Sequence, residues 1–193
     1  MSIRYYIAII IGLLIGMLYA DHVVAENLTV DEPVASKAGR CFHKLSNLYR
    51  ANISDETKDQ VLRLFVKYDV PTPLIAMASQ ESAFDPKAES TVGARGLFQI
   101  TKPALRDAAK ACTDLGYHPD RLYEPEYNFK AFICFTGVVR EVYLDGSPSF
   151  IAFLVYYNGG FRQLNRLRTG QTVVHETANY VTGVLYRMDL CQD

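Results

Sequence analysis

The sequence predicts an all-α protein. Hydrophobic side chains recur at helical spacing in several segments, no convincing pair of alternating strands appears, and no internal repeat is visible. The 193 residues are 49% hydrophobic and 21% charged, a composition typical of a globular chain with one core. Only residues 85–100, which are rich in turn formers, leave room for a minor β-hairpin.

The charge balance narrows the classes of partner. With 20 basic and 21 acidic residues the net charge is −1, so the chain lacks the overall basic field that favours nucleic-acid binding. We therefore expect no nucleic-acid partner. The chain has 13 Tyr, 10 Phe and no Trp, so any aromatic contact with a ligand must come from Tyr or Phe.

Residues 1–25 have the three-part pattern of a secretory signal peptide. Arg4 supplies a positive charge, an uncharged apolar run covers residues 7–20, and small or β-branched residues precede and include Ala25. The run is shorter than the roughly 20 residues that a transmembrane helix needs. We expect cleavage after Ala25, with Ala20 as the second candidate and an uncleaved anchor as the alternative. The protein is then expected to be periplasmic.

Export makes disulfides the expected state of the four cysteines. Four cysteines allow three connectivities, and the sequence does not choose among them. Our working assignment pairs Cys112 with Cys134, which would join neighbouring helices, and Cys41 with Cys191, which would tie the two ends of the chain. A metal site is disfavoured because no C-x-x-C occurs and the four histidines are scattered.

The mature chain is expected to begin with a flexible leader. Residues 26–38 are polar and show no clear period, and we group residues 26–53 as an N-terminal leader and first segment. The main domain is expected over residues 54–193. Ser54 precedes an acidic first turn and an apolar stripe, so it is predicted to cap the first helix of this domain.

Later helices are predicted from breaks and caps in the sequence. Pro71 ends the first helix, and Thr72-Pro73 begin a second one that leads to Glu81. Residues 85–99 are expected to form a loop. Further helices are predicted from residue 105 to 112, from a cap at Asn128, from Ser149 to Asn158-Gly159-Gly160, and from residue 180 to 188.

Glu81 is the candidate catalytic group. It follows the apolar segment 74–78 and precedes Phe84, so its carboxyl group is expected to lie among apolar neighbours, which raise a carboxyl pKa. Cleavage of a glycosidic bond needs such a group as general acid. Taken alone, the pattern favours an exposed glutamate at a helix end that makes a cap or a surface ion pair.

The segment 90–100 reads STVGARGLFQI. Its two glycines allow backbone conformations closed to other residues and let a ligand approach closely. The Gln99 amide is suited to hydrogen-bonding a sugar hydroxyl or N-acetyl group. The segment is no phosphate-binding loop, because the G-K-[ST] ending is absent.

Four short pieces occur in order along the chain: ESAF from Glu81, S-x-x-GA-x-GLFQ from Ser90, YNGG from Tyr157 and ET-x-x-YV from Glu176. Together they resemble the lytic transglycosylase domain of the soluble-transglycosylase (SLT) type. The family is similar in overall fold to goose-type lysozyme, so the resemblance implies a lysozyme-like helical domain with a cleft.

The resemblance implies a role for each matched residue. Glu81 matches a single catalytic acid/base, and Tyr180 matches the tyrosine that orients it. The residues implied to bind substrate or line its site are Ser82, Gln99, Tyr157 and Asn158.

Plainer interpretations stay open for several of these residues. Tyr157 could belong to the core, Asn158 could only terminate a helix, and Tyr180 could be a packed helix residue. Glu176 is expected to be a helix-start charge rather than catalytic. Tyr156 stands where the family usually has Ala, so packing behind the cleft is expected to differ.

The resemblance implies a peptidoglycan lytic transglycosylase that uses no cofactor or metal. Glu81 would protonate the β-1,4 oxygen between N-acetylmuramic acid and N-acetylglucosamine, then accept the proton of the 6-hydroxyl as a 1,6-anhydro end forms. Since the substrate's N-acetyl group stabilises the developing positive charge, a second carboxylate is not required.

Two other functions are carried as alternatives: a hydrolysing lysozyme-type muramidase and a non-catalytic peptidoglycan-binding assembly factor. Small single-domain enzymes of this type resemble those that serve secretion, conjugation or pilus machines. Peptidoglycan strands, and by analogy such a machine, are therefore the expected partners. Membrane contact is expected only through an uncleaved signal segment.

Overall fold

The computed structural model describes residues 36–144 and 149–192. Within these ranges the chain forms helices joined by loops and has no strand, which confirms the all-α prediction. Residues 85–100 contain only two isolated bridges, Glu89 with Arg95 and Arg95 with Ile100. The helical elements are α3 (Lys37–Leu48), α4 (Asp55–Lys67), α5 (Thr72–Ser82), α6 (Lys102–Ala111), η1 (Pro119–Tyr123), α7 (Pro125–Val138), η2 (Val139–Tyr143), α8 (Phe150–Arg168) and α9 (His175–Leu190).

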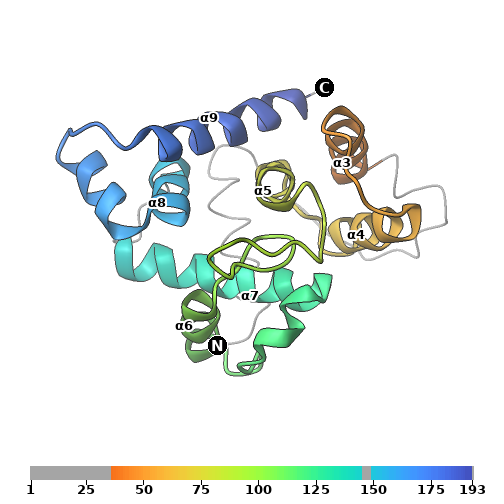
Figure 1. The fold of residues 1–193 in the computed structure, drawn as a ribbon, viewed down its shortest axis with the longest axis horizontal. Coiled ribbons are helices and arrows are strands. Elements are labelled where there is room, and N and C mark those ends of the chain that lie inside the picture. The colour runs from red at the N-terminus through yellow and green to blue at the C-terminus, as the bar shows by residue number, and fades with distance from the viewer. Residues whose placement is uncertain (1–35, 145–148, 193) are drawn as a thin grey trace, which may run out of the picture.

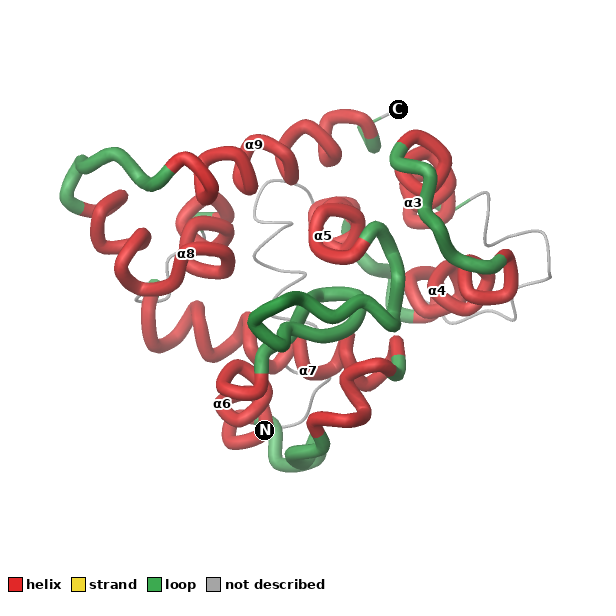
Figure 2. Tube along the Cα trace, in the orientation of Figure 1, coloured by secondary structure: helices red, strands yellow, loops and turns green. Residues whose placement is uncertain are grey.

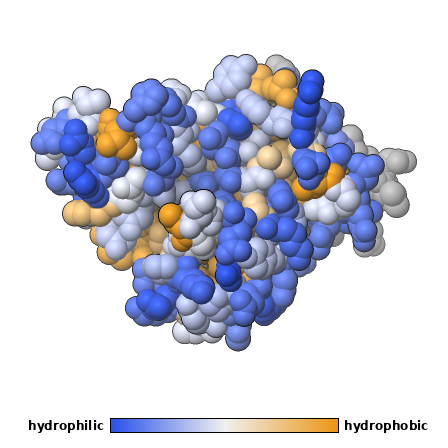
Figure 3. Space-filling model, in the orientation of Figure 1, coloured by the Kyte–Doolittle hydropathy of each residue, from blue (hydrophilic) through white to orange (hydrophobic). Residues whose placement is uncertain are grey.

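Helix α5 lies at the centre of the fold (Figure 1). Its residues Leu74 to Ser79 are all buried, as expected for a helix covered on every side. Helix α9 crosses above it, α3 and α4 lie to one side, and α7 runs below. The loop between α5 and α6 passes in front of α7 (Figure 2). The outer face drawn in Figure 3 is mostly hydrophilic, with hydrophobic side chains in small, separate patches.

Helix α3 was not predicted, and it corrects the expected leader. Ser36 caps it by accepting a hydrogen bond from the Gly39 amide at 2.9 Å. Phe42 and Leu45 are fully buried, and the Phe42 ring lies 4.8 Å from that of Phe84. Regular helix therefore begins at Lys37, inside the segment 26–38. The rest of that leader and the predicted signal peptide lie outside the described residues.

The helix caps are mostly as predicted. Ser54 and Ser149 cap α4 and α8 with their side-chain oxygens, and Pro71 stands immediately before α5. Helix α8 does not end at Gly160, however. The backbone kinks there, at φ 67° and ψ −172°, and helix resumes as far as Arg168. The last helix also begins earlier than residue 180, at His175.

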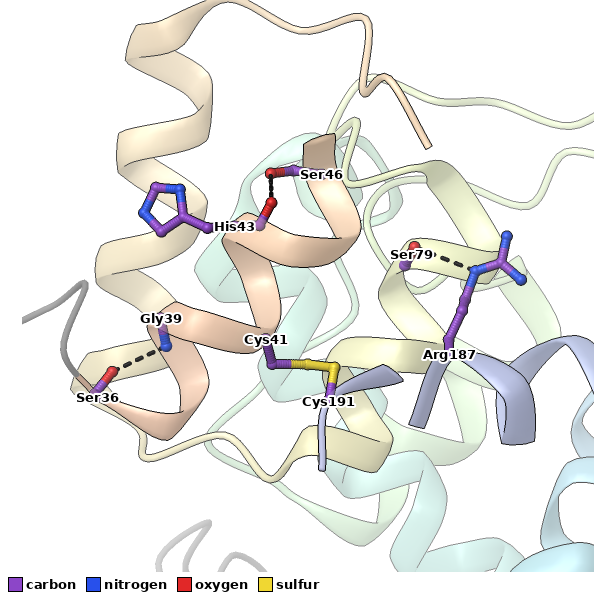
Figure 4. The surroundings of a disulfide bond; sticks show 8 residues. All are labelled: Ser36, Gly39, Cys41, His43, Ser46, Ser79, Arg187 and Cys191. Carbon is purple, nitrogen blue, oxygen red and sulfur yellow. Dashed lines mark hydrogen bonds between the residues drawn. A yellow bond between two sulfur atoms is a disulfide. The ribbon is translucent and has the colours of Figure 1, made fainter. Parts of the chain in front are cut away.

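Two disulfides join the cysteines in the pairs of the working assignment. Cys41–Cys191 links α3 to the end of α9 across 150 positions of sequence (Figure 4). Cys112–Cys134 links the end of α6 to α7 across 22 positions. Among the described residues, no helix has both the length and the apolar character needed to cross a membrane.

The two disulfides should differ in their contribution to stability. In the chain-entropy model, removing the longer link costs about 5 kcal/mol and removing the shorter one about 3 kcal/mol. We therefore expect the variant Cys41→Ala/Cys191→Ala to unfold at lower urea concentration than Cys112→Ala/Cys134→Ala, as followed by circular dichroism. The reverse order would contradict a mainly entropic contribution.

Candidate active site

The site is built where the last turn of α5 meets α9. The Tyr180 hydroxyl, from α9, donates a hydrogen bond to Glu81 Oε1 at 2.6 Å. Helix α5 ends at Ser82, one residue after Glu81, because Ala83 and Phe84 adopt positive φ values of 50° and 67°. This sharp turn buries the Phe84 ring and leaves Glu81 partly exposed at the helix end.

Burial dominates the electrostatics of Glu81. Loss of solvent raises the pKa of this carboxyl to about 7, while the hydrogen bond from Tyr180 acts in the opposite direction and favours the carboxylate. The pKa of Tyr180 is itself raised well above its usual value, first by burial and then by the charge of Glu81. A partly exposed carboxyl that is half protonated near neutral pH can both donate and accept a proton.

The glycine-containing loop is held in place from α7 by Asn128. This side chain is fully buried. Its Oδ1 accepts a hydrogen bond from the Phe98 amide at 2.9 Å, and its Nδ2 donates to the carbonyls of Arg95 and Leu122 at 2.8 and 2.9 Å. The prediction that Asn128 caps a helix is therefore wrong. Helix α7 begins at Pro125, and Asn128 lies inside it.

Gly96 is the point of closest approach between this loop and its support. Its φ is +75°, and a Cβ at this position would lie 2.1 Å from the Leu122 carbonyl oxygen and 2.4 Å from Asn128 Nδ2. Gly93 has a similar φ of +78° but has open space where its Cβ would be. Both glycines are needed for the turn, and Gly96 is also needed for the contact.

Ser82 and Tyr157 also contact this loop. Ser82 Oγ donates to the carbonyl of Leu97 at 2.9 Å and to that of Ala78 at 3.1 Å. The Tyr157 hydroxyl donates to the Phe98 carbonyl. The Tyr157 ring packs against those of Phe132, Phe135 and Phe153, so the core interpretation holds for the ring while the hydroxyl reaches the site. Burial raises its pKa, and nearby Glu81 adds to the rise.

Gln99 and Asn158 differ in the hydrogen bonds that their side chains make. Gln99 has a positive φ of 47°, and its Nε2 donates to the carbonyls of Ala88 and Gly96 at 3.1 and 3.0 Å. Its side-chain amide therefore closes the loop on itself. Asn158 is exposed, two residues before the kink in α8, and its side chain makes no hydrogen bond with the described residues.

The other nearby acidic residues have structural partners. Asp85 accepts a hydrogen bond from the Lys87 amide at 2.7 Å. Glu89 accepts hydrogen bonds from Arg95 at 3.1 Å and from Tyr123 at 2.6 Å. Glu176 is exposed in the first turn of α9, as expected of a helix-start charge.

In the part of the chain that the structure describes, no three His, Cys, Asp or Glu side chains gather closely enough to hold a metal ion.

The Tyr156 side chain of α8 packs against η2, the short helix that follows α7. Its ring stacks on that of Tyr143 with centroids 4.5 Å apart, and the Tyr143 ring also lies 6.1 Å from that of Phe161, beyond the kink. The residue that departs from the family pattern therefore contributes to an aromatic stack that spans the two halves of α8.

Comparison with known proteins gives one family. The sequence profile of the family described as "Transglycosylase SLT domain" matches residues 66–176. The chain is 36% identical over 87 residues to the soluble lytic murein transglycosylase of Escherichia coli strain K12. The aligned region is 45% of this chain and 13% of that protein. It is 31% identical over 130 residues to the membrane-bound lytic murein transglycosylase C of Yersinia pestis strain Pestoides F. That aligned region is 63% of this chain and 34% of the relative.

A solved structure supports the fold. The crystal structure of the 70 kDa soluble lytic transglycosylase from Escherichia coli superposes with a TM-score of 0.55 at 18% identity, covering 98% of this chain and 42% of that one. At this identity the match concerns the fold alone. The chain spans less than half the length of each of these three proteins.

The two loop glycines provide a matched pair of substitutions. Gly93→Ala and Gly96→Ala both place a side chain at positive φ, at a cost of roughly 1–2 kcal/mol, but only the second creates the contacts with Leu122 and Asn128. We expect Gly96→Ala to lower the free energy of unfolding by several kcal/mol and Gly93→Ala by about 1 kcal/mol, measured by urea denaturation. Equal losses would show that the close approach is unimportant.

Proposed function

We propose, from the premise that this chain belongs to the transglycosylase SLT domain family, that it is a peptidoglycan lytic transglycosylase. It would cleave the β-1,4 bond between N-acetylmuramic acid and N-acetylglucosamine and leave a 1,6-anhydro-muramic acid end. The observation that carries the proposal is the carboxyl group of Glu81, whose pKa burial raises to about 7 in the last turn of α5. The names of its relatives support the same reaction.

In the first step Glu81 acts as a general acid. Its proton passes to the glycosidic oxygen, the bond from that oxygen to C1 of the muramic acid breaks, and positive charge develops at C1. The carboxylate left on Glu81 then takes the proton of the muramic acid 6-hydroxyl, whose oxygen bonds to C1. One proton leaves the carboxyl and one returns, so the group is regenerated and no water is consumed.

Tyr180 is proposed to position Glu81. Its hydroxyl donates to Oε1, which leaves Oε2 to carry the transferred proton. The same hydrogen bond favours the carboxylate that the second step requires. A fixed donor whose geometry is set by helix packing needs little reorganisation during the reaction.

A single carboxylate suffices if the substrate's N-acetyl group stabilises the charge at C1, as in substrate-assisted glycosidases. The hydrogen bonds that Asp85 accepts from the Lys87 amide, and Glu89 from Arg95 and Tyr123, support this. Gln99 would meet the sugar through its amide oxygen, since the nitrogen is used within the loop. Ser82 and Tyr157 would shape the cleft through the loop, and exposed Asn158 would contact the glycan.

The wider setting is proposed by analogy. Cleavage of the signal segment would place the enzyme in the periplasm, where a small transglycosylase could open local gaps for a secretion, conjugation or pilus machine. Fold and chemistry alone do not name the machine. A hydrolysing muramidase and a non-catalytic binding protein are the alternatives that product analysis tests.

Glu81→Gln tests the reaction. It should leave the helical circular dichroism nearly unchanged and lower the release of anhydro-muropeptides from purified peptidoglycan by about 10²–10⁴-fold or more. Glu176→Gln, at the exposed start of α9, is the control and should remain active. Mass spectrometry identifies the chemistry, because hydrolysis adds one water and the anhydro product does not. Hydrolysed ends, or undiminished activity of Glu81→Gln, would overturn the proposal.

Tyr180→Phe tests the pH dependence. The hydrogen bond from the Tyr180 hydroxyl favours the carboxylate form of Glu81. Losing this bond should therefore raise the pKa of Glu81 above its value of about 7. Since the first step needs the protonated acid, the alkaline fall of kcat/KM should move to higher pH, with a lower maximum. Tyr186→Phe, at an exposed position of the same helix, should leave the profile unchanged. An alkaline limb that stays in place or moves down would contradict this role.

A further inference from the structure

Helix α3, which was not predicted from the sequence, is basic along its outer face. Lys37, Arg40 and Lys44 recur at spacings of three and four residues, so they lie on one side of the helix. All three side chains are exposed. Leu48, one turn further along the same face, is 54% exposed. We call these four residues the α3 basic stripe.

The opposite face of α3 is packed into the domain. Cys41, Phe42 and Leu45 are buried. Cys41 is joined to the end of α9 by its disulfide, and the Phe42 ring contacts that of Phe84 in the turn that follows α5. Figure 1 shows α3 at the side of the molecule away from α8. The disulfide and the aromatic packing therefore fix the direction of the stripe, which faces away from α5.

The stripe differs from the neighbouring helix α4 in the sign of its charge. Helix α4 also carries three cations at its surface, but each lies beside a carboxylate. These ion pairs are Lys58–Asp55, Arg63–Asp59 and Lys67–Glu126, with N–O distances of 3.0, 2.8 and 3.2 Å. The segment 36–54 contains no Asp or Glu, and Arg50 adds an exposed cation directly after α3. Since the whole chain has a net charge of −1, the excess of positive charge is local to this segment.

An anionic bilayer surface is the partner that this pattern fits. Basic side chains beside an exposed apolar one are typical of helices at a membrane surface, where the cations meet lipid phosphates and the apolar group enters between the head groups. Among the described residues, α3 is the first helix after the apolar run 7–20, which we expect to bring the chain to the membrane during export. Leu48 alone offers too little apolar area for the core of a stable protein interface.

We propose that the α3 basic stripe binds the anionic phospholipid surface of the membrane across which the chain is expected to be exported. The contact goes beyond the proposed reaction and rests only on the proposed export. It is independent of the predicted signal segment, which the sequence alone indicated as the one route to the membrane. Three cations and one apolar side chain give weak, reversible attachment, and a bilayer on the stripe lies on the other side of α3 from α5, the helix that carries Glu81.

Vesicle binding tests the stripe. The protein is purified after export, and its sedimentation is measured with vesicles of equal parts phosphatidylglycerol and phosphatidylcholine and with vesicles of phosphatidylcholine alone. Each cation near an anionic surface contributes about fivefold, so the anionic vesicles should bind about 100-fold more tightly at low salt. Added NaCl should reduce this preference, because salt screens exposed charges.

Charge removal localises the contact. The triple variant Lys37→Gln/Arg40→Gln/Lys44→Gln should lose the preference for anionic vesicles. The matched control replaces the three paired cations of α4 with Gln, which changes the net charge of the protein by the same amount, and it should keep the preference. Lys37→Arg/Lys44→Arg, which preserves the charge of the stripe, should also keep it. Leu48→Ser should weaken binding severalfold at low and at high salt.

The outcomes separate this site from the reaction. Equal binding to both kinds of vesicle, or equal losses in the α3 and α4 variants, would overturn the proposal. Displacement by soluble glycerol phosphate at the phosphate concentration of the vesicles would also overturn it, because the site would then bind a free phosphate group rather than a bilayer surface. The comparison of lipids needs no substitution, so it holds even if a variant folds poorly. Glu81→Gln should bind vesicles like the unsubstituted protein, so that failure of either proposal leaves the other intact.

Discussion

The hydrogen bond between Tyr180 and Glu81 requires that α9 stay packed on α5, and much of the fold maintains this packing. Gly183 allows the two helices to approach closely, because any side chain there would meet Gln80. The Cys41–Cys191 disulfide fastens the end of α9 to α3, and α3 buries Phe42 against the turn that follows α5. Helix packing thus sets the position of the candidate acid relative to Tyr180.

The loop that faces Glu81 depends on a different kind of support. A turn with several positive φ values is held by side chains from three helices: Asn128 from α7, Ser82 from α5 and the hydroxyl of Tyr157 from α8. All three bond to backbone groups of the loop. The loop is therefore fixed by polar contacts in a buried setting, where each unpaired partner would be costly. This explains how an irregular segment can keep a defined conformation beside the candidate acid.

The sequence predicted the features that depend on local pattern. The all-α class, the caps Ser54 and Ser149 and the apolar setting of Glu81 follow from periodicity and neighbouring residues. Helix α3 carries local signals, the Ser36 cap and the spacing of Phe42 and Leu45, that a closer analysis of the sequence could use. The other errors have tertiary causes. Asn128 has the residue type of a cap but bonds to a loop about 30 positions earlier. The second half of α8 follows a glycine pair that normally ends a helix. Only three-dimensional contacts distinguish these cases.

The burial of Glu81 has a consequence for folding itself. Because the pKa of this carboxyl is about 7 in the folded protein, above the ordinary value of 4.5 expected in the unfolded chain, folding between these pH values takes up a proton. The folded state binds more protons than the unfolded state there, so this group makes stability fall as pH rises from about 4.5 to 7. Folding of the domain and the pH of its solution are thereby coupled through the residue proposed to do the chemistry.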